Sequence, residues 1–201
     1  MTQAPSRRRH HTVKRLCDLT VASGGLLLLL PLIGALAAAV AVDSPGPAFY
    51  RQERLGRDRK PFLMVKLRTM HAKAEPDGAR LTVENDPRIT RVGRFLRRYH
   101  LDELPQLWNV VRGEMSLVGP RPERRVFADR ISAQAPEYER LFGLRPGLTS
   151  LGMVCFGYAS TTDEMIERMK FDLHYLDNTG FGQDMKILIQ TLKTVVTGKG
   201  L

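Results

Sequence analysis

Apolar residues near the start of the chain form one continuous segment, from Leu19 to Val42, in which no residue is charged. In α-helical conformation its 24 residues would extend about 36 Å, against about 30 Å for the hydrocarbon core of a bilayer. Pro31 lies near the middle of the segment, where a proline removes a backbone donor and clashes with the preceding turn. The pattern predicts a membrane-embedded helix that bends at Pro31.

Basic residues flank this segment on both sides: Arg7, Arg8, Arg9, Lys14 and Arg15 before it, and Arg51, Arg54, Arg57, Arg59 and Lys60 after it. Lys and Arg tend to stay on the cytoplasmic face, and a single crossing cannot keep both groups there. A re-entrant helix–break–helix, which dips into the membrane and returns to the same face, satisfies both. We therefore predict a basic tail over residues 1–13 and a re-entrant membrane helix over residues 14–43.

Two other interpretations of the segment stay open from the sequence. One is a simple span. The other is a secretory signal peptide cleaved near Ala39-Val40-Ala41; the apolar part of such peptides is usually only about 7–15 residues long, and here it is longer and contains a central proline.

From residue 44 onward the pattern is typical of a small α+β domain that is mostly helical. Two short strands are expected at Ala48–Tyr50 and Phe62–Leu67. Helical periodicity then predicts helices that begin near Asp86, Leu104, Glu123, Thr162 and Asp184, the third broken at Pro136. The apolar side of the last helix fits either the core, which is the default, or an interfacial position on the membrane. We expect residues 44–201 to form a cytoplasmic catalytic domain with interfacial helices.

The chain is strongly basic: its 201 residues carry a net charge of +10. Such a balance indicates an anionic partner: nucleic acid, lipid headgroups or a phosphorylated substrate. Hydrophobic residues make up 43% of the chain, enough for a core, which argues against global disorder. Cys17 and Cys155 are too few for a disulfide framework and agree with a reducing, cytosolic setting.

Two adjacent carboxylates, Asp102 and Glu103, lie in the most basic part of the sequence. With Pro105 in the first turn, one interpretation is that Asp102 caps a helix and Glu103 is a favourable first-turn charge. The other is chemical: two acids among many cations would bind Mg²⁺ that bridges a diphosphate, or one could be a nucleophile at phosphorus. The surrounding cations are Arg91, Arg94, Arg97, Arg98, Arg112, Arg121, Arg124 and Arg125.

Four further cations are candidates for binding phosphate. Arg121 stands between Pro120 and Pro122, which restrict its backbone and leave the guanidinium little entropy to lose; an ordinary structural turn is the alternative. Arg145, before Pro146-Gly147, is a similar but weaker case. Lys66 and Arg68 would share one face of a strand and could meet either phosphate or solvent.

At these residues the sequence resembles the bacterial sugar transferases known as small monotopic phosphoglycosyl transferases. Five motifs carry the resemblance, which covers nearly the whole chain: Lys66-Leu-Arg-Thr-Met70, Asp86-Pro-Arg-Ile-Thr90, Leu101-Asp-Glu-Leu-Pro-Gln-Leu-Trp-Asn109, Met115-Ser-Leu-Val-Gly-Pro-Arg-Pro122 and Arg145-Pro-Gly-Leu-Thr149. It implies transfer of a sugar-1-phosphate from a UDP-sugar donor to a polyprenol phosphate acceptor, with release of UMP. It also implies Mg²⁺, a covalent phosphosugar intermediate, and a monotopic protein in the bacterial inner (cytoplasmic) membrane.

The resemblance also assigns roles residue by residue. Asp102 would be the nucleophile and Glu103 the partner associated with the metal. Arg121, within Pro120-Arg121-Pro122, would contact the nucleotide or its phosphates. The weaker assignments to the same site are Lys66, Arg68 and Arg145, and the membrane helix would bend at Pro31.

Two departures from the family pattern limit what the resemblance implies. After Arg145-Pro-Gly-Leu-Thr149 the family often continues with glycine and then glutamine, whereas this chain has Ser150-Leu-Gly-Met153. Larger relatives carry additional N-terminal membrane helices and a soluble domain, and we expect this chain to be a catalytic core alone.

Other function classes are weighed against this one. A membrane-anchored nucleic-acid binder would explain the charge, but aromatic residues are only 7% and no binding motif is recognised, so we expect membrane lipids rather than nucleic acid as a partner. A metal-dependent phosphatase would use a similar acidic pair. The sequence leaves open the transferred sugar, the glycan pathway and whether the protein forms a homo-oligomer.

Overall fold

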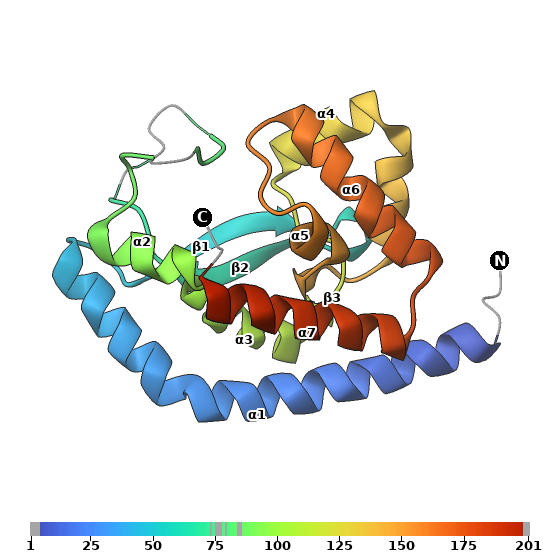
Figure 1. The fold of residues 1–201 in the computed structure, drawn as a ribbon, viewed down its shortest axis with the longest axis horizontal. Helices are drawn as coiled ribbons and strands as arrows, with labels where there is room; N and C mark the ends of the chain where they lie inside the picture. The colour runs from blue at the N-terminus through green and yellow to red at the C-terminus, as the bar shows by residue number, and fades with distance from the viewer. Residues whose placement is uncertain (1–4, 73, 75–77, 79, 84–85, 199–201) are drawn as a thin grey trace.

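The computed structural model describes residues 5–72, 74, 78, 80–83 and 86–198, with side chains described from residue 12. Its longest element is helix α1 (Pro5–Asp43), which runs beneath the other elements and changes direction in its C-terminal half (Figure 1). The helix continues through Pro31 as one element. The stretch Thr12–Asp43 is long and apolar enough to cross a membrane, and Leu27 and Leu28 are 74% and 80% exposed. The predicted long apolar N-terminal helix is confirmed.

The first part of α1 is held against the domain by polar contacts. The Arg15 guanidinium donates to the carbonyl oxygens of Val110 (2.6 Å) and Val111 (3.0 Å). Asp18 is buried and accepts a hydrogen bond of 2.7 Å from the Ser116 hydroxyl. A buried charge is tolerated when it is paired and hydrogen-bonded, so these contacts fix where α1 begins to run along the domain.

Two side chains hold the C-terminal end of α1: the Asp43 carboxylate accepts from the Val92 backbone (3.0 Å), and Arg68 binds the residues that follow the helix. Arg68 is buried and its guanidinium donates to the carbonyl oxygens of Ser44 (2.5 Å) and Pro45 (2.6 Å). The guanidinium also donates to the Val40 carbonyl oxygen in the last turn of α1 (3.5 Å), where a cation is favourable because the last carbonyls of a helix carry partial negative charge. Both ends of the described part of α1 therefore contact the same domain.

A β-hairpin follows α1. Strand β1 (Phe49–Leu55) pairs antiparallel with β2 (Pro61–Leu67), from Phe49 opposite Leu67 to Leu55 opposite Pro61, and the turn contains the 3₁₀ helix η1 (Arg57–Arg59). Both strands were predicted, but β1 continues five residues beyond the expected end at Tyr50. This difference matters because the added residues include Arg54.

A second, parallel pair of strands was not predicted. It joins β3 (Ser116–Val118) to β4 (Gly147–Thr149), and so brings together two of the sequence motifs. The backbones are very close: a Cβ atom on Gly147 would lie 2.2 Å from the Gly119 nitrogen. Glycine at this position therefore allows the loop that bears Arg121 to rest on β4.

The remaining helices pack around these strands (Figure 1). A helix was expected to begin at Asp86, but Asp86 instead accepts a 3.0 Å hydrogen bond from the Arg88 backbone, and Thr90 caps a helix that begins at Arg91. The last helix begins at Phe181, not Asp184, because Gly180 is its N-cap. The elements are α2 (Arg91–Arg98), η2 (Leu101–Gln106), α3 (Leu107–Arg112), α4 (Arg125–Gln134), η3 (Pro136–Gly143), α5 (Leu151–Cys155), α6 (Thr162–Asp177) and α7 (Phe181–Thr197).

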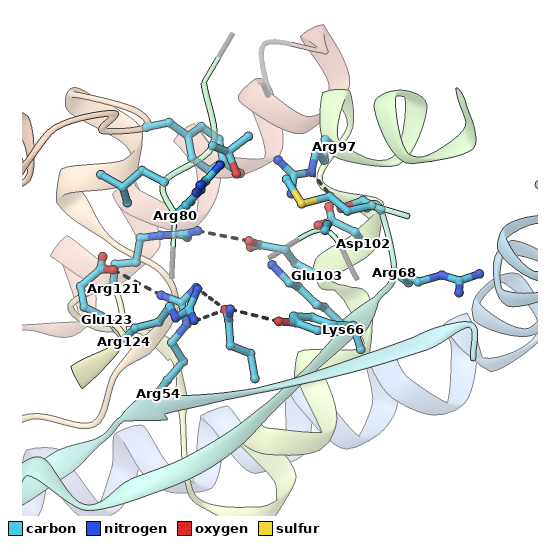
Figure 2. Close-up of a pocket in the computed structure, with 18 of the residues that line it drawn as sticks. Arg54, Lys66, Arg68, Arg80, Arg97, Asp102, Glu103, Arg121, Glu123 and Arg124 are labelled. Atoms are coloured by element: carbon cyan, nitrogen blue, oxygen red, sulfur yellow. Dashed lines mark hydrogen bonds and ion pairs between the residues drawn. The ribbon is translucent and has the colours of Figure 1, made fainter. Parts of the chain in front are cut away.

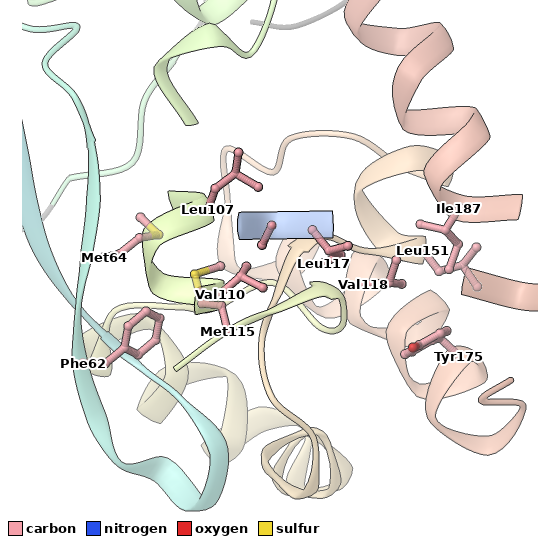
Figure 3. Packing of buried hydrophobic residues seen from close by; sticks show 11 residues of the cluster. Phe62, Met64, Leu107, Val110, Met115, Leu117, Val118, Leu151, Tyr175 and Ile187 are labelled. Carbon is pink, nitrogen blue, oxygen red and sulfur yellow. The ribbon is translucent and has the colours of Figure 1, made fainter. Parts of the chain in front are cut away.

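Among the described residues the largest hydrophobic cluster joins α1 to α7. Ala22 of α1 and Ile187 of α7 are completely buried in one cluster with Val110 and Met115 (Figure 3). The apolar side of α7 is divided, since Leu192 is 64% exposed. The described structure is mostly helical with some sheet, which confirms the predicted fold class at that level.

Candidate functional site

A cavity of about 480 Å³ lies between β1, β2, η2 and the loop that follows β3. This volume is within the usual range for small-molecule sites. Figure 2 shows that charged side chains converge on it from separate elements: Arg54 from β1, Lys66 from β2, Asp102 and Glu103 from η2, and Arg121 from the loop.

The acidic pair is presented by the sharp turn between α2 and η2. His100 adopts a left-handed backbone conformation (φ 53°, ψ 21°) and is the N-cap of η2. Asp102 and Glu103 both lie inside η2, so the interpretation of Asp102 as a simple helix cap is wrong. Successive residues of a 3₁₀ helix diverge by about 120°: buried Asp102 lies near Lys66, and Glu103 faces Arg121.

The electrostatic environment of Asp102 is set by opposing effects. Burial raises the pKa of its carboxyl, as does the charge of Glu103, whereas Lys66 and Arg97 lower it. Burial in turn lowers the pKa of Lys66 to about 8, an effect that the neighbouring Asp102 partly opposes. The carboxylate is therefore poorly hydrated and balanced by cations, an arrangement that favours attack on an electrophile.

Arg121 is fixed from three directions. Its backbone N–H donates to Asp172 (3.4 Å), which also accepts from the Gly152 backbone (2.8 Å). Its guanidinium lies 3.6 Å from Glu103 and 5.3 Å from the ring centroid of Tyr158. Together with the flanking prolines, these contacts hold a cation at the edge of the cavity beside the acidic pair.

A buried carboxylate supports the floor of the site. Glu123 accepts from Arg54 at 3.3 Å and from Arg168 of α6 at 2.6 Å. Arg54 also donates to Gln52 (2.6 Å) and to the carbonyl oxygen of Pro122. Burial lowers the pKa of Arg54 to about 10, so this guanidinium remains charged at neutral pH. The network ties β1, the arginine loop and α6 together beneath the cavity.

The structure brings some of the predicted site residues together and separates others. Lys66, Asp102, Glu103 and Arg121 line the cavity. Arg68 lies at its wall, but its guanidinium points away, to the end of α1 (Figure 2). The Arg145 guanidinium donates to the Gly113 carbonyl oxygen (3.0 Å), near Arg15.

The cluster of eight arginines is also divided in space. Arg97, Arg121 and Arg124 line the cavity, whereas Arg112 pairs with Glu114 at the surface (3.2 Å). Nearness in sequence to Asp102 was therefore a poor guide to nearness in the fold.

Sequence reasoning missed three contributors to the site: Arg54, Glu123 and Tyr158. Arg54 was counted only as a membrane-flanking cation, although alternation along a longer β1 would have placed it on one face with Gln52. Glu123 was grouped with a polar helix. No local signal marks Tyr158, which reaches the site only through the packing of the segment after α5. Ser150, the departure from the family pattern, caps α5 by accepting from the Met153 backbone (3.0 Å).

The donor set suits a metal ion that is shared with phosphate. Among the described residues no group of three or more His, Cys, Asp or Glu side chains could hold a metal ion. Mg²⁺ is commonly bound through one or two carboxylates plus substrate phosphates and water. Asp102 and Glu103 fit that coordination, and they do not form an all-protein cage.

Comparison with known proteins shows the family to which this chain belongs. The model of the bacterial sugar transferase family matches residues 9–198, and the chain belongs to this family. It is 41% identical over 186 residues to a UDP-glucose:undecaprenyl-phosphate glucose-1-phosphate transferase of Caulobacter vibrioides, covering 92% of this chain and 70% of the relative.

Two further relatives differ in length. A UDP-N-acetylgalactosamine-undecaprenyl-phosphate N-acetylgalactosaminephosphotransferase of Aeromonas hydrophila is 37% identical over 94% of this chain, and the match spans 44% of the relative. The exopolysaccharide production protein PSS of Rhizobium leguminosarum bv. phaseoli is 38% identical over 94% of this chain and 98% of the relative. The chain thus spans less than half of the first relative and nearly all of the second.

Proposed function

We propose that this chain transfers a sugar-1-phosphate from a UDP-sugar to undecaprenyl phosphate and releases UMP, in the first membrane step of polysaccharide or glycoconjugate assembly. The observation that carries the proposal is the buried Asp102, beside Glu103, in a cavity lined by Lys66, Arg97 and Arg121. The names of the relatives in Caulobacter and Aeromonas support the donor and acceptor classes.

The residues at the cavity suit a two-step exchange at phosphorus. In the first step an Asp102 carboxylate oxygen bonds to the sugar-bearing phosphorus, the bond to the bridging oxygen breaks, and UMP leaves with that electron pair. In the second step an oxygen of the lipid phosphate attacks the same phosphorus and Asp102 departs. Lys66, Arg97 and Arg121 neutralise the phosphate oxygens, whose charge would otherwise repel the carboxylate.

Glu103, beside the nucleophile Asp102, is the residue that would hold Mg²⁺ at this site. The ion supplies charge neutralisation at the phosphate oxygens when it is bound. Arg121, held by Asp172 and by its ion pair with Glu103, positions the diphosphate between the acidic pair and the arginine loop.

The arrangement of α1 supports a monotopic, re-entrant position in the membrane with the catalytic domain on the cytoplasmic face. Arg15 and Asp18 in the N-terminal half of the helix and Ser44 just after its C-terminus contact the same domain. A straight transmembrane helix would place one end about 30 Å away across the hydrocarbon. Exposed leucines in the middle of α1 would then enter the lipid, and the cavity would lie near the headgroups where the acceptor phosphate resides.

A donor screen tests the proposed reaction. Purified protein in nanodiscs with Mg²⁺ and undecaprenyl phosphate is incubated with individual UDP-sugars, and UMP is measured. We expect UMP release with at least one donor, dependent on the lipid phosphate for multiple turnovers. Release of inorganic phosphate in place of UMP would identify a phosphatase, and no turnover with any donor would contradict the transferase proposal.

The lowered pKa of Lys66 leads us to expect a loss of activity at alkaline pH. Because burial lowers its pKa to about 8, the cation is present below that pH and is lost above it. The value of kcat/KM reports the free enzyme, so it should fall as pH rises through about 8. The Lys66→Arg variant stays charged and should lack this fall, whereas Lys170→Arg, at an exposed position, should retain it. A flat wild-type profile would contradict the prediction.

A further inference from the structure

Tyr158 links parts of the site that the proposed chemistry does not connect. Its ring is stacked on the imidazole of His100, with centroids 5.8 Å apart and planes at 8°. A hydrogen bond of 3.1 Å joins the Tyr158 hydroxyl and Nδ1 of His100. The same tyrosine ring lies 5.3 Å from the Arg121 guanidinium, a distance at which a cation is attracted to an aromatic face.

His100 is the residue whose backbone sets the direction of η2. A left-handed conformation is unfavourable for a non-glycine residue, although His is among the residues that adopt it more often. The His100 N–H donates to Arg97 (3.1 Å), and its carbonyl oxygen accepts from the Glu103 backbone (3.2 Å). The turn from α2 into the acidic pair therefore depends on one strained residue, which needs support from its surroundings.

The contacts close into a ring. The Tyr158 hydroxyl is hydrogen-bonded to His100, and the His100 carbonyl oxygen accepts a hydrogen bond from the Glu103 backbone. The Glu103 carboxylate forms an ion pair with Arg121 at 3.6 Å, and the Arg121 guanidinium lies beside the Tyr158 ring. Burial and the charge of Glu103 raise the pKa of Tyr158, so the hydroxyl stays protonated and keeps its hydrogen bond over the working pH range.

We propose that Tyr158 and His100 are positioning residues that hold the Asp102-Glu103 turn and orient Arg121 toward the substrate phosphates. The catalytic consequence rests on the proposed function, whereas the restraint of the turn does not. Removing the hydroxyl takes away its hydrogen bond to His100 but leaves the ring stacked on His100 and beside Arg121. Removing the ring releases both residues.

Kinetics of graded variants test the pair. We expect Tyr158→Phe to lower kcat about 3- to 10-fold with KM for the UDP-sugar nearly unchanged, the effect of losing one hydrogen bond. Tyr158→Leu also frees Arg121, so it should lower kcat about 30- to 100-fold, a size expected for misplaced catalytic groups, and raise KM as well. Tyr99→Phe is the matched control, because Tyr99 packs on Phe95 (5.1 Å) and should behave as wild type.

Rescue at position 100 separates positioning from simple folding. Asn tolerates the left-handed backbone and offers an oxygen to the Tyr158 hydroxyl, so His100→Asn should keep kcat within about threefold of wild type. His100→Ala has neither property and should lose about tenfold or more. Melting temperatures are measured for all variants, and equal losses of kcat in both His100 variants, or a loss that merely follows the melting temperature, would overturn the proposal.

Hydrogen exchange tests the restraint without any turnover. The backbone amides of η2 (Leu101–Gln106, apart from Pro105, which has no N–H) should exchange about tenfold faster in Tyr158→Leu than in wild type, with smaller changes in Tyr158→Phe and none in Tyr99→Phe. If the wild type fails to release UMP but these differences appear, the proposed function fails and the positioning pair stands. If exchange over η2 is the same in Tyr158→Leu and wild type, the pair does not hold the turn and the proposal is wrong.

Discussion

Replacing Asp102 by asparagine should abolish both UMP release and transfer of labelled phosphosugar to the protein. The amide has nearly the same shape but lacks a carboxylate oxygen that can attack phosphorus, so the first step has no nucleophile. We expect kcat to fall at least about 10³-fold, as removal of a nucleophile does in other covalent enzymes. The measurements are UMP release and retention of labelled sugar on denatured protein in the absence of lipid phosphate.

The same variant should fold. Burial raises the pKa of Asp102, so folding carries a cost for the ionised carboxylate that a neutral amide avoids, and this offsets the counter-charge that Lys66 and Arg97 lose. The control is Asp58→Asn, at an exposed position with φ 56° that asparagine tolerates, and it should keep full activity. Residual UMP release above about a tenth of wild type would contradict the nucleophile assignment.

Local patterns predicted helical structure beside the acidic pair but placed its start near Leu104, whereas η2 begins at Leu101 and α3 at Leu107. Pro105 correctly indicated a helical turn there, but Asp102 and Glu103 lie within η2 and not before a helix. Ordered motifs around Lys66, Asp102 and Arg121 then led to the family that the comparisons show. These predictions succeed because each depends on a few neighbouring residues.

The remaining features of the site depend on contacts between distant segments. Arg68 and Lys66 are two residues apart, but β2 ends at Leu67, so Arg68 leaves the strand and reaches the end of α1. Arg145 is held beside α1 because β4 pairs with β3. The covering of Arg121 by Tyr158 follows from the packing of α5 and α6. Such placements are set by tertiary contacts that no local pattern encodes.

Of the substitutions proposed for this protein, Glu123→Gln should lower the free energy of unfolding the most. The carboxylate lies between the guanidinium groups of Arg54 and Arg168, and all three side chains are at most 12% exposed. The neutral amide removes the carboxylate with which both buried cations form ion pairs, and breaking a buried pair in this way typically costs about 3–5 kcal/mol. For a protein of this size we expect the melting temperature to fall by roughly 6–20 °C.

The matched control is Glu139→Gln, which removes a carboxylate paired with Arg59 at the surface. Exposed pairs contribute about 0–1 kcal/mol, so its melting temperature should change by only a few degrees. Because Glu123 supports Arg54 and the loop before Arg124, activity at a temperature where Glu123→Gln remains folded should fall mainly through a higher KM for the UDP-sugar. Equal melting temperatures for the two variants would show that Glu123 does not hold the floor of the cavity, and the cavity cations would then have to be positioned by the backbone pairing of β3 and β4 instead.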